Sequence, residues 1–266
     1  MMKQQPRIYM LHRVIEHYDE DDYYFQRKTA ISWNKFIELL DLIEMNSWKT
    51  KPISNITMGF TDQDVFITFD DGYEDNCNAL DELIRRGMTA TVFPVKDFSL
   101  TGFSPIDDMA QHVMASNDIT PSLLQSLLGG RIKKLLRGMS ALRYRYYRKH
   151  WFSITIDADN SDLFMSEQQL KRYCAQGIEL GIHGRSHRAF INLTSSELYS
   201  ELIGSLNWLK SLGSMSAVSI CFPHGKHNEQ VIKLSQSVGQ ILLGVDCDTL
   251  DSAVLRRVHV TEDYNV

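Results

Sequence analysis

The stretch VFITFDDG, residues 65–72, is apolar for most of its length and then ends in two carboxylates and a glycine. A second stretch, IELGIHGRSH at residues 178–187, ends in two histidines. The apolar part of each has the length and composition of a short buried strand. Parallel β/α barrels build their active sites from polar residues at the C-terminal ends of the strands. The two stretches therefore predict an α/β barrel with one site made from both.

The side chains at these strand ends are of types that bind metals or move protons. Asp71, His183 and His187 form a set of two histidines and one carboxylate, which leaves coordination positions open for water and substrate. Asp70 lies beside the carboxylate ligand and stays free to act as a base. The pattern predicts a metal-dependent hydrolase.

Each motif has a simpler interpretation when it is taken alone. An Asp-Asp-Gly sequence after a strand often forms only a turn, because Asp and Gly suit the tight backbone there. Two histidines four residues apart can simply lie on one face of a helix. Here Gly184 and Ser186 separate the histidines and a strand-like run precedes them, which favours a loop. Four residues of metal-site type at two strand ends make the functional interpretation the stronger one.

The length and composition are those of an ordinary enzyme domain. The 266 residues suit a β/α barrel that forms one domain over residues 1–266, and 43% hydrophobic content is enough for its core. A net charge of -5 gives no general attraction to nucleic acid, so we expect no nucleic-acid partner. The four cysteines are scattered without a Cys-x-x-Cys pair, which argues against a zinc ribbon or a disulfide framework.

The beginning of the chain predicts a strand rather than a targeting segment. The run IYMLHRV at residues 8–14 is too short for a signal-peptide core or a membrane span, and no small-residue cleavage site follows it. We expect it to form the first barrel strand with His12 at its mouth. The expected location is the cytoplasm, with peripheral attachment to the inner face of the membrane as a further possibility.

Strand-like runs alternate with helical periodicity along the rest of the chain. Helices are predicted over residues 32–45, 75–86, 166–176, 194–212 and 230–237, and further strands over 89–95, 217–223, 241–245 and 255–260. Ser32 is a predicted N-cap, and Thr194 and Glu197 have the spacing of a capping box. The alternation implies parallel strands with right-handed crossovers.

These motifs resemble those of the polysaccharide deacetylase family, the carbohydrate esterases with a NodB-type domain. The family's first motif, Thr-Phe-Asp-Asp-Gly, is intact at residues 68–72. Its second, His-[Ser/Thr]-x-x-His, is similar to residues 183–187, with Gly184 at the hydroxyl position. Residues 9–14 and Phe-Pro-His-Gly at 222–225 also resemble one branch. The resemblance covers roughly residues 8–260, with a less recognisable stretch near 100–162. It implies a distorted (β/α)7 barrel that removes an N-acyl group, acetyl or formyl, from an amino sugar.

The resemblance also implies roles for the site residues. Asp71, His183 and His187 would hold one divalent metal, with zinc favoured, because an amide needs a Lewis acid to polarise its carbonyl. Asp70 would be the general base, and the cation would offset its repulsion from Asp71. The oxyanion would be met by the metal and by a backbone N–H in the turn at residues 222–225.

Two family positions are replaced in this chain. The third motif of the family often carries an arginine that steadies the base aspartate, and Cys221 occupies that place here. Arg256 or Arg257 could supply the charge instead. His224 stands where the family has a tyrosine.

The proton donor to the leaving amine stays open. In the family it is a histidine from a late Leu-x-His motif. His259 is the nearest match, although its spacing differs, and His224 and His12 compete with it. Residues beside the motifs are expected to contact substrate. They are His12, Tyr73, Phe222, Pro223, Gly225 and Arg257.

Residues 131–150 hold eight basic side chains and no acidic one, interleaved with leucines and tyrosines. In an acidic chain this asymmetry predicts an anionic partner between Arg131 and Lys149, with a solvated helix face as the alternative. The partner would be anionic membrane lipid or the diphosphate of a nucleotide- or lipid-linked sugar. Together with the missing signal sequence, it favours a precursor in surface-polysaccharide biosynthesis as the substrate.

Other functions stay open. A phosphatase of the haloacid-dehalogenase type needs Asp-x-Asp, whereas the aspartates here are adjacent. An amidase that acts on a non-sugar C–N bond is the nearest alternative among hydrolases. A catalytically inactive glycan-binding barrel is disfavoured by the four core residues, but the missing third-motif arginine keeps it open.

Overall fold

The computed structural model describes residues 5–102, 104–107, 109–110, 125–126, 130–139, 146, 163–214, 218–245 and 253–265. Its central feature is a six-stranded sheet with the order β10-β1-β5-β6-β7, in which β4 also pairs with β5. All of these pairings are parallel. The strands are β1 (Arg7–Leu11), β4 (Lys49–Thr50), β5 (Asp64–Asp71), β6 (Thr91–Pro94), β7 (Glu179–Leu180) and β10 (Val258–His259).

A second parallel pair, β8 (Ser219–Cys221) with β9 (Ile241–Leu243), closes this sheet into a ring. Ile182, just beyond β7, bridges to Ile220 of β8 in parallel. On the other side, Leu243 bridges in parallel to Leu255, which precedes β10. Each of these contacts is a single bridge, so fewer residues pair there than along β5. The predicted distorted (β/α)7 barrel is confirmed.

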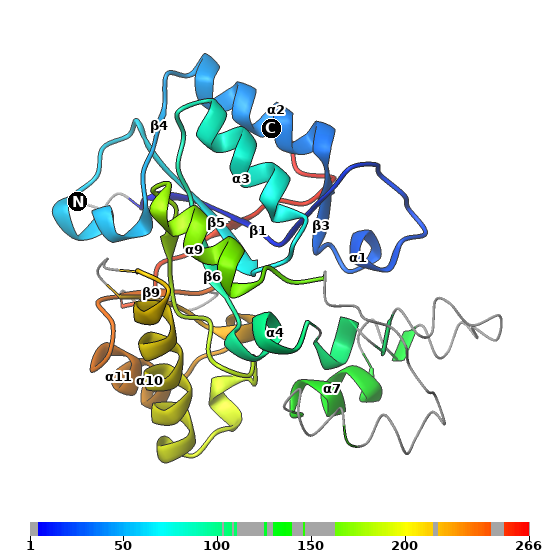
Figure 1. The fold of residues 1–266 in the computed structure, drawn as a ribbon, viewed down its shortest axis with the longest axis vertical. Helices are drawn as coiled ribbons and strands as arrows, with labels where there is room; N and C mark the ends of the chain where they lie inside the picture. The colour runs from blue at the N-terminus through cyan, green and yellow to red at the C-terminus, as the bar shows by residue number, and fades with distance from the viewer. Residues whose placement is uncertain are drawn as a thin grey trace.

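Helices cover the outside of this barrel. Figure 1 shows α2 and α3 together on one side and α10 with α11 on the other. Their ends differ from the predicted ranges by at most one residue. Caps explain this agreement: the Ser32 side chain accepts from the Lys35 N–H, and Thr194 and Glu197 form both halves of a capping box. The helices are α2 (Trp33–Met45), α3 (Asn76–Arg85), α9 (Glu167–Ala175), α10 (Ser195–Ser211) and α11 (Glu229–Gln236).

Shorter elements complete the described chain. The parallel strands β2 and β3 form a separate pair, so the predicted first strand ends at Leu11 and a second begins at Arg13. The helices of the described residues lack the length and apolar character that crossing a membrane requires. These elements are β2 (Arg13–Ile15), α1 (Tyr23–Gln26), β3 (Ala30–Ser32), η1 (Ile53–Met58), α4 (Lys96–Thr101), α7 (Arg131–Arg137), η2 (Phe190–Asn192) and η3 (Pro223–Gly225).

The central strand β5 is buried along its whole length and faces two different cores. Val65, Ile67 and Phe69 belong to the large core that includes residues of the outer helices. Phe66 belongs to the smaller core inside the ring. Because side chains alternate along a strand, Asp70 continues the inward row that starts at Phe66. Asp70, the predicted base, therefore points into the barrel at the C-terminal end of β5.

The basic segment is described only in part. Its first turns form α7, which packs through Leu136 and Met139 on a third core. Beyond Met139, the structure describes only Tyr146 of this segment, so Arg143, Arg145, Arg148 and Lys149 lie outside the described residues.

Candidate active site

The predicted metal ligands come together at the C-terminal ends of the barrel strands. Asp71 ends β5, and His183 and His187 follow β7. The Oδ1 atom of Asp71 lies 3.3 Å from Nε2 of His183 and 3.1 Å from Nε2 of His187. The donor atoms of all three lie within 4.8 Å of one another. The three side chains can thus converge on one small cation.

The backbone around this cluster is strained. Asp71, His187 and His224 have φ of +68°, +58° and +60°, in the left-handed region that L residues rarely adopt. They are three of the five such non-glycine residues in the described chain. Each such conformation costs on the order of 1–3 kcal/mol and persists only where the surrounding structure imposes it. Their concentration here marks this end of the barrel as a functional site.

The two histidines differ in protonation. Burial opposes a charge on His183, but its contacts with Cys221 and Asp71 hold its pKa well above the ordinary value, so a cation at Nε2 would have to displace a proton. Burial lowers the pKa of His187 to about 4, against the opposing charge of Asp71, so its ring is neutral near pH 7. Burial disfavours the charge on Asp71, but His187 and His183 hold the pKa of that carboxyl below its ordinary value. Nδ1 of His183 lies 2.9 Å from the backbone oxygen of Cys221, which can only accept. Nδ1 therefore carries the proton and leaves Nε2 as the ligand atom.

The missing third-motif arginine is replaced by Arg257. Its guanidinium makes two hydrogen bonds of 2.7 Å to the two carboxylate oxygens of Asp70. It also donates to the Gly244 carbonyl, the Thr68 hydroxyl and the Cys221 sulfur. Arg257, just before β10, is fully buried, whereas its neighbour Arg256 is exposed. Of the two arginines left open by the sequence, the structure therefore selects Arg257.

This pair keeps the expected base ionised. Burial alone would raise the pKa of Asp70, but the charge and hydrogen bonds of Arg257 more than offset it and hold that pKa below its ordinary value. Burial raises the pKa of the Cys221 thiol, which lies 3.5 and 3.6 Å from the two Asp70 oxygens and donates to them. Asp70 thus has a fixed orientation and a negative charge.

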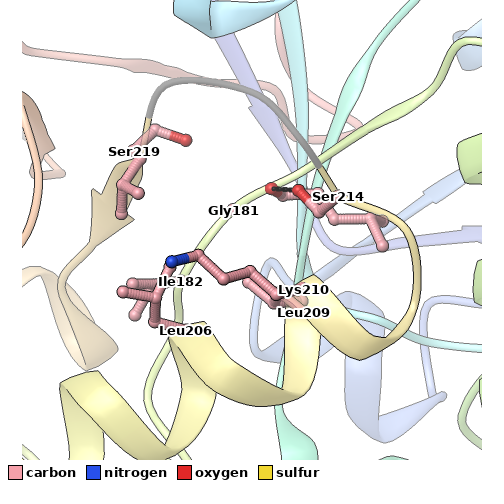
Figure 2. Close-up of a pocket in the computed structure, with 9 residues that line it drawn as sticks. Gly181, Ile182, Leu206, Leu209, Lys210, Ser214 and Ser219 are labelled. Atoms are coloured by element: carbon pink, nitrogen blue, oxygen red, sulfur yellow. Dashed lines mark hydrogen bonds between the residues drawn. The ribbon is translucent and has the colours of Figure 1, made fainter.

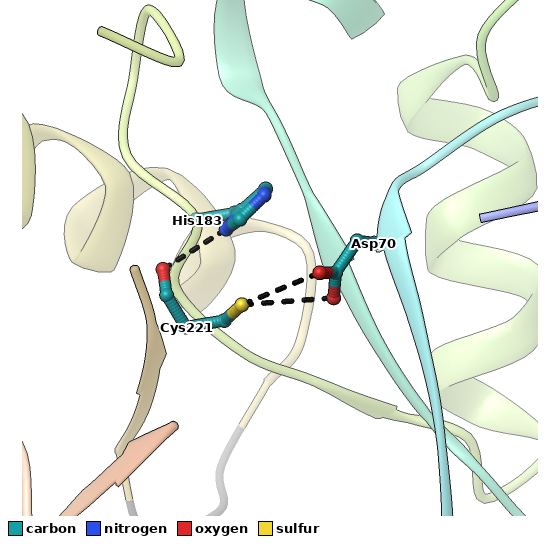
Figure 3. A group of neighbouring side chains, drawn as sticks. All are labelled: Asp70, His183 and Cys221. Atoms are coloured by element: carbon teal, nitrogen blue, oxygen red, sulfur yellow. Dashed lines mark hydrogen bonds between the residues drawn. The ribbon is translucent and has the colours of Figure 1, made fainter. Parts of the chain in front are cut away.

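A second group of metal-type donors overlaps the first. Figure 3 shows the side chains of Asp70 on β5, His183 in the segment after β7 and Cys221 on β8 close to one another. Both Asp70 oxygens are bound by Arg257, and Nη2 of this arginine lies 3.0 Å from the Cys221 sulfur. A guanidinium at this position repels a cation, so the geometry favours the group that contains Asp71.

The three candidate proton donors lie at the same end of the barrel. His12 directly follows β1 and His259 ends the neighbouring strand β10; their ring centroids are 5.6 Å apart in a T-shaped contact. His224 packs its ring 4.5 Å from that of His187. Burial lowers the pKa of His12, although Asp70 opposes this effect.

Three of the expected substrate contacts are buried residues. Arg257 and Phe222 are 0% exposed and Tyr73 is 2% exposed. Phe222 packs in the large core, and the Tyr73 hydroxyl donates to Asp107 at 3.2 Å. Of the other three expected contacts, the half-buried ones are His12 and Gly225, and the buried one is Pro223.

One buried carboxylate was not found by the sequence reasoning. Glu201 of α10 is 5% exposed and accepts hydrogen bonds from the loop that joins His183 to His187. It lies in the buried row of its helix between Leu198 and Leu202. An acidic residue within an apolar helical stripe was the signal that could have identified it.

A cavity of about 260 Å³ lies apart from this site. Figure 2 shows it between α10 and the strands β7 and β8, with Lys210, Ser214 and Ser219 among its lining residues. The lining includes none of the aspartates and histidines described above. The candidate active site is therefore at the strand ends.

Comparisons with known proteins agree with the geometry. A family model described as polysaccharide deacetylase matches residues 58–241. The fold is similar to that of the Streptococcus pyogenes deacetylase PplD, solved in complex with acetate (TM-score 0.66, 13% identity, covering 98% of this chain and 94% of that one). It is also similar to a de-N-acetylase from Aggregatibacter actinomycetemcomitans (0.66, 14%, 99% and 97%) and to IcaB from Ammonifex degensii (0.60, 14%, 98% and 94%). A comparison with curated proteins gave no match.

Proposed function

Because the chain belongs to the polysaccharide deacetylase family, whose members remove N-acetyl groups from polysaccharides, we propose that it is a metal-dependent N-deacylase of amino sugars. The acyl group is acetyl or formyl. The observation that carries this proposal is the pairing of two clusters at one end of the barrel. Asp71, His183 and His187 offer three donors to a cation, and beside them Arg257 keeps Asp70 ionised.

The donor set fits one divalent metal, with zinc as the proposed ion. Histidine nitrogens and a carboxylate are ligands that zinc uses in catalytic sites, where a position stays open for water or substrate. The bond from His183 to the Cys221 carbonyl is of the kind that orients a metal-bound histidine. When bound, the ion would polarise the acyl carbonyl and lower the pKa of a water molecule.

Asp70 is the proposed general base. Each carboxylate oxygen has a second lone pair, so Asp70 can accept a proton from the attacking water while Arg257 holds it. Its lowered pKa keeps it in the ionised form that this step needs across the neutral range.

The leaving amine and the oxyanion need donors from the other strands. We assign amine protonation to His259, with the adjacent His12 and with His224 as the competing donors. For the oxyanion, we propose a backbone N–H of the turn at residues 222–225, which follows β8.

The surroundings of the site favour a substrate that carries phosphate. The ring of Phe98 lies 5.6 Å from that of His187 and belongs to the same core as Leu136 of α7. The basic helix α7 thus shares a core with Phe98, which lies beside His187, and it exposes Arg131 and Lys134. We propose a nucleotide- or lipid-linked precursor sugar whose phosphates meet this helix, with peripheral contact to anionic membrane on the cytoplasmic side.

Metal analysis with a release assay tests the proposed function. The purified protein should bind about one divalent ion per chain and release acetate or formate from N-acyl amino sugars. A His183→Ala, His187→Ala double variant should lose both. Full metal occupancy in that variant would contradict the assigned ligands. Release from simple amides but from no amino sugar would identify a non-sugar amidase instead.

A further inference from the structure

Three donors of the loop between the two histidine ligands, residues 183–187, are bound by a single carboxylate. Oε2 of Glu201 accepts the N–H of Arg185 at 2.6 Å and the N–H of Ser186 at 2.8 Å. Oε1 accepts the Ser186 hydroxyl at 2.6 Å. One side chain on α10 thus binds three donors of a loop that begins and ends with a ligand.

The negative charge of Glu201 is balanced locally. Arg188, the residue after the loop, places Nη2 3.4 Å from Oε1 of Glu201 and donates through Nε to the Ser186 hydroxyl at 3.2 Å. Its Nη1 also lies 3.3 Å from Glu197, one turn earlier on α10. The carboxylate of Glu201 therefore stays buried with both oxygens bound.

The close approach of loop and helix depends on Gly184. Its φ is +81°, and a Cβ atom here would lie 3.4 Å from Oε2 of Glu201 and 3.1 Å from a ring carbon of Phe190. A side chain at this position would crowd the ring of Phe190 and come into contact with the carboxylate, besides adopting an unfavourable φ. Glycine thus suits the close approach of the loop to α10.

We propose that Glu201 is a positioning residue that holds this loop so that the Nε2 atoms of both histidines face Asp71. The inference rests on the metal site proposed above. His187 has an unfavourable φ of +58°, which the loop must maintain before a cation arrives. Without Glu201, the N–H groups of Arg185 and the buried Ser186 lose their acceptor, and the loop must move to find another. The ligands would then be ordered only on binding, so the affinity for metal falls.

Glu201→Gln tests this with Glu197→Gln as the matched control. Both substitutions remove a negative charge from α10 beside Arg188, but glutamine at 197 can keep the capping box and does not touch the loop. The measurements are the Zn²⁺ dissociation constant by chelator competition, the melting temperature of the metal-free protein, and hydrogen exchange at the Arg185 and Ser186 amides.

Glutamine has one acceptor oxygen for the three donors that the two oxygens of Glu201 bind, and its NH2 group cannot accept. We therefore expect Glu201→Gln to weaken Zn²⁺ binding by roughly 10–100-fold, in the range of outer-shell substitutions at metal sites, and to speed exchange at the loop amides. Glu197→Gln should leave both unchanged. A lower melting temperature with a Zn²⁺ affinity within about twofold of the parent would overturn the proposal, because Glu201 would then be only structural.

Ser186→Ala covers the case in which Glu201→Gln does not fold. It deletes one of the three contacts, so a smaller loss of Zn²⁺ affinity is expected, and an unchanged affinity would count against the proposal. Failure of the parent to bind Zn²⁺ would overturn the proposed metal site and this inference with it. The exchange rates would still show whether Glu201 holds the loop.

Discussion

Replacing Arg257 with leucine should destabilise the protein more than any substitution of a surface arginine. The variant keeps a long apolar side chain but leaves the Asp70 carboxylate buried without its cation. Removing one partner of a buried ion pair costs about 3–5 kcal/mol in the free energy of unfolding. For a chain of this size each kcal/mol lowers the melting temperature by about 2–4 °C, so a loss of roughly 6–20 °C is expected.

The loss of stability in the Arg257→Leu variant should depend on pH in a definite direction. In the parent the folded pKa of Asp70 is below its ordinary value, so its contribution is complete above the unfolded pKa of about 3.9 and is lost only as the pH falls through the lower folded value. In the variant, burial without Arg257 raises the folded pKa above the unfolded one. The penalty is then largest at neutral pH and shrinks on acidification. The acid limb of the activity profile should also move to higher pH.

Calorimetric melting of the parent and the Arg257→Leu variant between pH 8 and 5 measures both effects. Arg256→Leu is the matched control, since it removes the exposed neighbour, and it should melt close to the parent. The reasoning is refuted if Arg257→Leu melts within about 2 °C of the parent, a shift worth no more than about 1 kcal/mol. It is also refuted if the gap between variant and parent widens as the pH falls.

Three further outcomes follow from the site. Asp70→Asn should keep the metal and lose on the order of 10²–10⁴-fold in rate, because an amide cannot accept the proton, whereas Asp71→Asn should lose metal first; the reverse metal contents would exchange the two roles. Treatment with a chelator should abolish activity and lower the melting temperature of the parent, but leave the melting of the double-histidine variant unchanged. Neutralising Arg143, Arg145 and Arg148 should raise KM for a phosphorylated substrate with kcat nearly unchanged, or weaken binding to anionic vesicles; equal behaviour on both would reduce the segment to a solvated helix.

Much of the architecture was predictable because its signals are local. Periodicity and capping residues act within one or two helical turns, so the predicted helices begin and end within one residue of those observed. The family resemblance drawn from the Thr-Phe-Asp-Asp-Gly and His-x-x-x-His motifs is confirmed by the family match. Strand ends in a parallel barrel share one edge, which is why Asp71, His183 and His187 could be expected to meet.

The sequence by itself therefore determined the order of elements and the residues that gather at the strand ends. Only the tertiary structure decided that Arg257, and not Arg256, neutralises Asp70 at a separation of 187 residues. It alone showed that Glu201 accepts hydrogen bonds from the loop between the histidines and that the Phe222 side chain packs in the core. The reason is physical: these contacts depend on how the ring closes and on which face each side chain takes, and no local pattern encodes the distance between segments that closure brings together.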